Sequence, residues 1–222
     1  MRMMNLLLTL RNKLGLQPRP VLNSLPSVVD FTAKQSAFVS QTTLFGYIKT
    51  RAGTSWPKLF EDDTYLVSLR TARSHFFAAC VSDLSLFFAA RMFRDGQFSA
   101  EQAEELAVRI AQQVLITPDI DKHEDIDPDA FQDVVNRTRQ RASVMPWAEA
   151  ATSALAFQSS SDAFMRWAPV TDEFKASDEE IMRNSLHMRW IGIRRDIKET
   201  LQVEAMKHDL HLISASYSGR PT

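Results

Sequence analysis

The residues whose chemistry first calls for an explanation are Asp83 and His75, in the apolar stretch HFFAACVSDLSLFFAARMF at residues 75–93. An ionised carboxylate among aromatic side chains is costly, so it either gains partners or takes up a proton. One hypothesis is a catalytic acid with a raised pKa in a cleft beside His75. The other is a buried ion pair that sets the register of neighbouring helices. In a helix the two residues lie about two turns apart, so they are not a dyad by themselves.

A buried ion pair needs a cation from another helix, because Arg73 lies about 15 Å from Asp83 along the helix axis. The candidates are a helix N-terminus and three arginines near the C-terminal end: Arg189, Arg194 and Arg195. Two basic clusters, RTRQR at 137–141 and IRR at 193–195, carry the charge needed to touch phosphates. With a balanced net charge of -1 we expect solvated faces or ion-pair partners, and no nucleic acid as a partner.

A metal site is the next possibility, because Glu204, His208 and His211 fall at i, i+4 and i+7. A helix brings these three side chains to one face, where they have the chemistry to bind a metal. The acidic loop TPDIDKHEDIDPD at 117–129 lacks the glycine and the final glutamate of a calcium-binding EF-hand loop. We therefore expect solvated acids there, and we expect neither a resident metal nor a cofactor.

The common catalytic motifs are missing from the sequence. Its six glycines never have the spacing of a G-x-S-x-G nucleophile elbow, and no Gly-rich phosphate loop or paired-histidine zinc motif occurs. The single cysteine, Cys80, lies in an apolar stretch where its thiol would be inert, and it excludes a disulfide framework within the chain. We therefore expect a cytoplasmic protein, with membrane association left open as an alternative. The missing motifs favour a non-enzymatic function.

The elements that position these residues are predicted to be helices throughout, giving an all-α, single helical domain. Two are long, at about 62–94 and 178–210, and several are shorter. The second carries a continuous apolar stripe: Met182, Leu186, Trp190, Ile193, Ile197 and Leu201. The first contains Asp83, whose charge at the centre of a membrane span would cost about 2.5 to 3.5 kcal/mol, so we interpret it as a buried core helix.

Local signals set the expected helix boundaries. Asp30 caps a helix to about Arg51, with one aromatic face formed by Phe31, Phe38 and Phe45. Capping boxes open helices at two further places, through the pairs Ser99 and Gln102, and Ser177 and Glu180. The Ser-rich sequence QSSSD at 158–162 is predicted to be a break.

Four segments are expected along the chain: an amphipathic helix at 1–14, a Pro-containing linker at 15–29, the helical domain at 30–213 and a flexible tail at 214–222. The first segment carries an apolar stripe formed by Met3, Leu7, Leu10 and Leu14. This stripe either docks on the protein's own body or contacts a partner or a membrane surface.

Several stretches, including LTLRNKLGLQPRPVLNSLPS, FTAKQSAFVSQTTLFGYIKTRAG and FMRWAPVTDEFK, resemble a family of small, uncharacterised alphaproteobacterial proteins. Some members of that family are labelled "esterase". The resemblance implies a bacterial protein and, as an alternative function, a hydrolase, but it carries over no catalytic residues. The residues themselves offer Asp83 and His75 as candidates for an unconventional site of that kind. From the residues themselves we predict a non-enzymatic adaptor or accessory subunit that acts through contact with a protein or a membrane surface.

Overall fold

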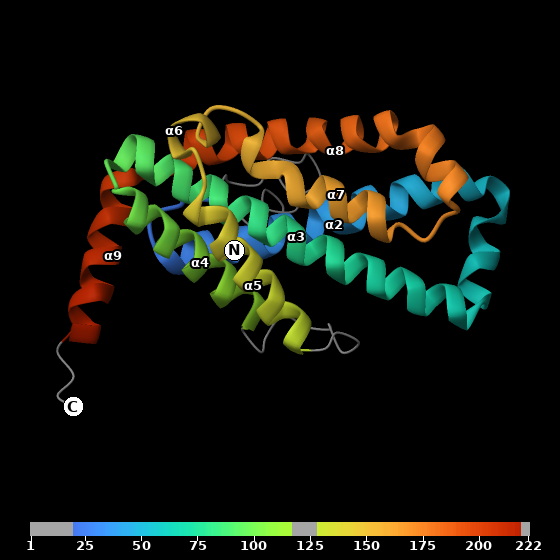
Figure 1. Cartoon of the computed structure of the whole chain (residues 1–222), viewed down its shortest axis with the longest axis horizontal. Coiled ribbons are helices and arrows are strands. Elements are labelled where there is room, and N and C mark those ends of the chain that lie inside the picture. Colours follow the sequence, from blue (N-terminus) through green and yellow to red (C-terminus); the bar gives the residue numbers. More distant parts are fainter. Residues whose placement is uncertain (1–19, 117–127, 219–222) are drawn as a thin grey trace, which may run out of the picture.

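The computed structural model describes residues 20–116 and 128–218, and side chains up to residue 115 and from 131 to 210. Helices form these parts of the chain, and the fold class is all-α as predicted (Figure 1). The elements are α2 (Leu25–Ala52), η1 (Gly53–Glu61), α3 (Asp63–Gly96), α4 (Ala100–Ile116), α5 (Pro128–Ser143), α6 (Trp147–Ala150), η2 (Leu155–Phe157), α7 (Gln158–Trp167), α8 (Asp172–Thr200) and α9 (Val203–Ser218). The predicted stripe Met3, Leu7, Leu10 and Leu14 and most of the acidic loop lie outside the described residues.

Helix α3 is the central element, as the sequence predicts, and it runs through the middle of the molecule (Figure 1). Asp62 caps its first turn by accepting hydrogen bonds from the backbone N–H groups of Thr64 and Tyr65. It ends at Gly96, where Gln97 adopts a left-handed conformation with φ 57°. By length and composition α3 is able to cross a membrane, but 89% of its apolar window is buried by the rest of the described chain. This is the environment of a core helix.

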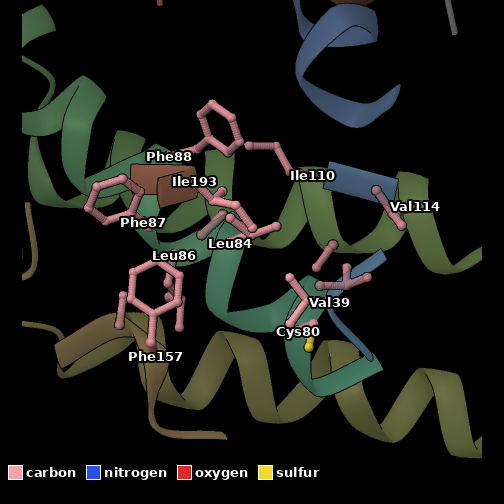
Figure 2. Packing of buried hydrophobic residues seen from close by; sticks show 14 of the residues in the cluster. Val39, Cys80, Leu84, Leu86, Phe87, Phe88, Ile110, Val114, Phe157 and Ile193 are labelled. Atoms are coloured by element: carbon pink, nitrogen blue, oxygen red, sulfur yellow. The ribbon is translucent and has the colours of Figure 1, made fainter. Parts of the chain in front are cut away.

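The hydrophobic core surrounds α3 on several sides. Figure 2 shows Val39 of α2, Ile110 and Val114 of α4, Phe157 of η2 and Ile193 of α8 gathered around it. All of these side chains belong to one cluster of buried residues. From Phe76 to Met92 every residue of α3 is buried, which explains why no single apolar stripe dominates that part of its sequence.

Helix α2 begins at Leu25, several residues before the predicted start at Asp30. A capping box between Ser24 and Ser27 opens the helix, and proline is favoured in its first turn because its missing N–H has no helical acceptor there. Leu22 is fully buried just before this start. The segment predicted as a linker at 15–29 thus contributes its last residues to a helix and to the core.

The phenylalanines of the predicted aromatic face of α2 differ in burial, since Phe38 is 54% exposed while Phe31 is buried. Residues seven apart drift by about 20° around a helix, so a heptad of phenylalanines follows the border of the buried face. The centre of that face is lined by aliphatic and small polar side chains: Val28, Thr32, Ser36, Val39 and Thr43. Phe38 instead lies under the guanidinium of Arg189, 5.9 Å from its ring centroid.

The second long helix, predicted as one element at 178–210, is two helices in the structure. Helix α8 begins early, at Asp172, and ends at Thr200, and α9 leads away from its end at a steep angle (Figure 1). Leu201 is extended, and the flanking backbone forms an isolated bridge with Leu22. Leu22 N–H donates to the Thr200 carbonyl at 3.2 Å, and Gln202 N–H donates to the Leu22 carbonyl at 2.9 Å. These two hydrogen bonds to Leu22 take the place of helical hydrogen bonds at Thr200 and Gln202. The helix therefore ends here although no glycine or proline stops it.

Asp209 of α9 holds the other side of this junction. Its Oδ2 accepts a hydrogen bond of 2.7 Å from the backbone N–H of Leu25, the first residue of α2. A carboxylate at this position satisfies a helix N–H that has no helical acceptor and interacts favourably with the helix dipole. Asp209 therefore attaches α9 to the start of α2.

We predict that Asp209→Ala lowers the free energy of unfolding by about 1 kcal/mol, because an N-terminal N–H of α2 loses its acceptor. Urea denaturation followed by circular dichroism measures this loss. Glu204→Ala is the matched control, since Glu204 is an exposed acid on the same helix whose ion pair with Lys207 is long, at 3.9 Å. Equal effects of the two changes would contradict the assigned contact.

Candidate functional site

Asp83 is completely buried, and both oxygens of its carboxylate have partners. Arg141 of α5 donates from Nη1 to Oδ1 at 2.7 Å, which makes a charge-assisted hydrogen bond inside an ion pair. The backbone N–H of Ser160 in α7 donates to Oδ2, also at 2.7 Å. The carboxylate therefore joins three helices, and we define Asp83, Arg141 and Ser160 as the Asp83 centre.

The Arg141 guanidinium extends the Asp83 centre in two further directions. Nη1 also donates to the Ser82 hydroxyl at 3.0 Å, and Nη2 donates to the carbonyl of Ala156 in η2 at 2.8 Å. Thr138, one turn before Arg141, donates to the same Ser82 hydroxyl at 2.8 Å. A planar guanidinium with five donors is suited to bind several acceptors at fixed angles. Arg141 thereby fixes the chain before α7 as well as α3.

Helix α7 begins at Gln158, inside the Ser-rich stretch that the sequence predicted as a break. The N-cap residue of α7 is Phe157, whose side chain makes no capping hydrogen bond. The acceptor is Asp83 instead, whose Oδ2 receives a hydrogen bond from the backbone N–H of Ser160 in the first turn of α7. The Ser160 hydroxyl accepts a bond of 3.1 Å from Trp190 Nε1, which connects α8 to the same centre. A distant carboxylate is thus the cap that local sequence lacks.

Burial raises the pKa of Asp83 above the ordinary aspartate value, while the Arg141 charge and the hydrogen bonds from Ser160 and Arg141 act in the opposite direction. Burial also raises the pKa of the nearby Cys80 thiol well above its usual range, with a further contribution from the Asp83 charge. Cys80 is fully buried, so its thiol is protonated and enclosed, as expected for an inert cysteine.

The three arginines considered from the last helix are not the partners of Asp83. Arg194 lies over the Phe87 and Phe157 rings, at 5.5 Å and 6.0 Å, and donates to the Thr152 carbonyl at 2.7 Å. Arg195 lies 3.9 Å from Asp196, and Arg189 lies over Phe38. Of the candidate partners, a helix N-terminus does contact Asp83, through the backbone N–H of Ser160. The cation is Arg141 of the RTRQR cluster, for which the sequence left open a solvated face or an ion-pair role.

His75 does not belong to the Asp83 centre. Its ring is half-buried and stacks on Trp167 of α7, with ring centroids 3.8 Å apart and planes 9° from parallel. Partial burial lowers the pKa of His75, and the charges of Arg137 and Arg166 lower it further. The imidazole is therefore held in its neutral form close to two cations.

A pocket of about 570 Å³ lies between α3, α5 and α7, and His75 is on its wall. The other lining residues are Ala79, Ser82, Val134, Arg137, Gln140, Arg141, Val144, Ser159, Asp162, Ala163, Arg166 and Trp167. Asp83 is not one of them, although its partners Arg141 and Ser82 are. The Asp83 centre thus forms the support behind this pocket, and Arg141, with its side chain 21% exposed, connects the two.

A second surface lies on the outer side of α8. Phe174, Ile181, Met188 and Ile191 are all exposed large apolar side chains. The first three recur every seven residues, so they lie along one line of the helix. We call these four residues the α8 outer stripe. The buried stripe of the same helix, which contains Met182, Leu186, Trp190, Ile193 and Ile197, lies on the opposite side.

The metal-site hypothesis gains no support from the part of the chain that the structure describes. Among those residues no group of three or more metal-ligating side chains comes together. Glu204 and His208 are exposed on α9, and Glu204 lies 3.9 Å from Lys207. The side chain of His211, the third predicted ligand, lies outside the described residues.

Comparisons with models of known protein families, with curated proteins and with solved structures find no match for this chain. Its function is therefore inferred from the geometry of the Asp83 centre, the pocket beside it and the α8 outer stripe.

We predict that Asp83→Ala lowers the free energy of unfolding by about 3–5 kcal/mol, because it leaves a largely buried Arg141 without its counter-ion and uncaps α7. Asp83→Asn is expected to lose less, since an amide oxygen still accepts a hydrogen bond. Asp133→Ala, an exposed aspartate of α5, is the control and should change stability by no more than about 0.5 kcal/mol. Chemical denaturation gives all three values, and a loss for Asp83→Ala no larger than the control would contradict the assignment.

We also predict that His75 titrates below the ordinary histidine value of 6.5 in the folded protein. The unfolded chain then binds more protons between the two pKa values, so the contribution of His75 to stability is lost as the pH falls through that interval. Nuclear magnetic resonance follows the imidazole directly. Arg137→Gln or Arg166→Gln should raise its pKa, and Arg195→Gln on α8 should leave it unchanged. A His75 pKa insensitive to both pocket arginines would refute this electrostatic account.

Proposed function

We propose that this protein is a non-enzymatic helical adaptor or accessory subunit that binds a partner protein through the α8 outer stripe. The observation that carries the proposal is the pair of opposite apolar faces on α8. One face packs into the core, while Ile181 and Met188 on the other are 63% and 68% exposed. Single exposed apolar residues are common in soluble proteins, but an aligned row along one helix is typical of a docking site.

The spacing of the stripe favours a helix as the partner element. A seam along which two helices pack at a shallow angle has two apolar positions per seven residues, and Phe174, Ile181 and Met188 fill one of them while Ile191 adds the second. Helix α8 runs along one edge of the molecule (Figure 1), and its stripe residues are 44% to 68% exposed, with the Phe174 ring also 5.3 Å from the guanidinium of Arg51. We therefore propose that an amphipathic helix of a second protein packs lengthwise on Phe174, Ile181 and Met188.

The alternative of a hydrolase that uses Asp83 and His75 has weaker support. Both carboxylate oxygens of Asp83 are engaged by Arg141 and Ser160, and the carboxylate does not line the pocket. His75 contacts Trp167 through its ring face instead of meeting Asp83. A general base and an acid need to reach the same reacting atoms, which this arrangement does not favour.

We predict that Ile181→Glu combined with Met188→Glu abolishes partner binding without unfolding the protein, because both side chains are exposed. The control combines Val21→Glu with Val67→Glu, which adds the same charge at residues of similar exposure, 51% and 52%, that are not part of the α8 outer stripe. Cross-linking and affinity purification from the source cells, with each variant compared to wild type, identify proteins lost only with the stripe variant. The purified partner is then titrated by calorimetry.

Sedimentation of the purified protein alone distinguishes a second copy of the chain from a different partner. Loss of a specific partner by the stripe variant, with retention by the control, is the expected result. Recovery of the same proteins at the same levels by all three forms would contradict a docking role for the α8 outer stripe.

A further inference from the structure

The pocket between α3, α5 and α7 has an excess of positive charge. Arg141 is neutralised by Asp83. Asp162 also lines the pocket, four residues before Arg166 on α7, and lies 3.3 Å from Arg183 of α8, which also pairs with Glu179 at 2.8 Å. Arg137 and Arg166 remain. Among the residues that the structure describes, neither has an ion pair with a carboxylate. The three arginines of the pocket thus outnumber its carboxylates, Asp162 in the wall and Asp83 behind it, and the site keeps a net positive charge.

The pocket also offers a planar, apolar side. Trp167 and His75 form a flat stack, and the guanidinium of Arg166 lies 5.4 Å from the Trp167 ring centroid. Four small or branched aliphatic side chains add to this side, among polar lining residues such as Gln140 and Ser159: Ala79, Val134, Val144 and Ala163. Charge and apolar surface are therefore combined in one hollow, as in sites for small organic ligands.

We propose that this pocket binds a small organic anion, in which a carboxylate or phosphate group is joined to a compact apolar body. Arg137 and Arg166 would hold the oxyanion, since guanidinium groups bind such oxygens in bidentate fashion. The apolar body would lie against Trp167 and Ala163. The pocket volume, about 570 Å³, fits a ligand of this size. This site is separate from the α8 outer stripe and does not depend on the function proposed above.

The Asp83 centre gives the site its rigidity. Arg141 and Ser82, which both line the pocket, are fixed from behind by Asp83 and Thr138. The His75 ring is neutral beside the two arginines, so it adds no charge of its own. An anion bound between Arg137 and Arg166 would offset their charges at His75. Its imidazole resonance therefore reports occupancy independently of affinity.

The test uses the full chain and four probes measured by calorimetry at fixed ionic strength: phenyl phosphate, benzoate, inorganic phosphate and uncharged benzamide. The two aromatic anions should bind and raise the His75 pKa, while benzamide and inorganic phosphate should bind more weakly. Arg137→Gln and Arg166→Gln should each weaken binding about tenfold. Both arginines are exposed, and circular dichroism confirms that the variants remain folded.

The matched control replaces two arginines outside the pocket, Arg139→Gln with Arg195→Gln, and should bind the aromatic anions as wild type does. Three results would overturn the proposal: no binding of either aromatic anion, equal binding of benzamide, or binding unaffected by the Arg137 and Arg166 variants. If inorganic phosphate bound as tightly as the aromatic anions, the proposed contact of an apolar ligand body with Trp167 and Ala163 would be overturned. The Ile181→Glu and Met188→Glu variant should bind the anions normally, so this site and the stripe fail or succeed separately.

Discussion

The Asp83 carboxylate meets a guanidinium from α5 and a backbone N–H from the first turn of α7 in the interior of the protein. Because an unpartnered charge there would cost several kcal/mol, the three helices are constrained to approach at one position. Arg141 also donates a hydrogen bond to the Ala156 carbonyl, and the Ser160 hydroxyl accepts one from Trp190 on α8, so η2 and α8 are held by the same residues. The pocket, the stacked His75 ring and the orientation of α8 all depend on elements that this centre holds together.

Carboxylates also connect helices at two other junctions. Asp178 of α8 is buried, accepts a hydrogen bond of 2.9 Å from the Tyr47 hydroxyl and forms an ion pair with Arg51, both on α2. Asp209 of α9 caps α2 in a similar way. Apolar packing around α3 supplies most of the burial but has little directional preference. Directional contacts by carboxylates therefore select one arrangement of the outer helices.

Sequence periodicity predicted the features that depend on neighbouring residues, namely helices and their caps. It identified the all-α class, the central helix, the capping box of Ser99 and Gln102, and the burial of Asp83 with a helix N-terminus as one candidate partner. It placed Arg141 in a basic cluster with the charge for ion pairs but did not assign it to Asp83, since Arg141 lies far along the chain beyond the acidic loop. It also missed the break after Thr200 and the start of α7, since these depend on Leu22 and on Asp83. Contacts between distant residues leave no local pattern.

Asp83 has an architectural role, and the two proposed binding surfaces, the cationic pocket and the α8 outer stripe, lie around it. A double-mutant cycle on Asp83→Ala and Arg141→Met tests the central claim most directly, by chemical denaturation of wild type, both single variants and the double variant. Coupled residues should give a double variant that loses about 0.5–3 kcal/mol less than the sum of the single losses. Losses that add to within about 0.5 kcal/mol would show that the pair does not hold the helices together.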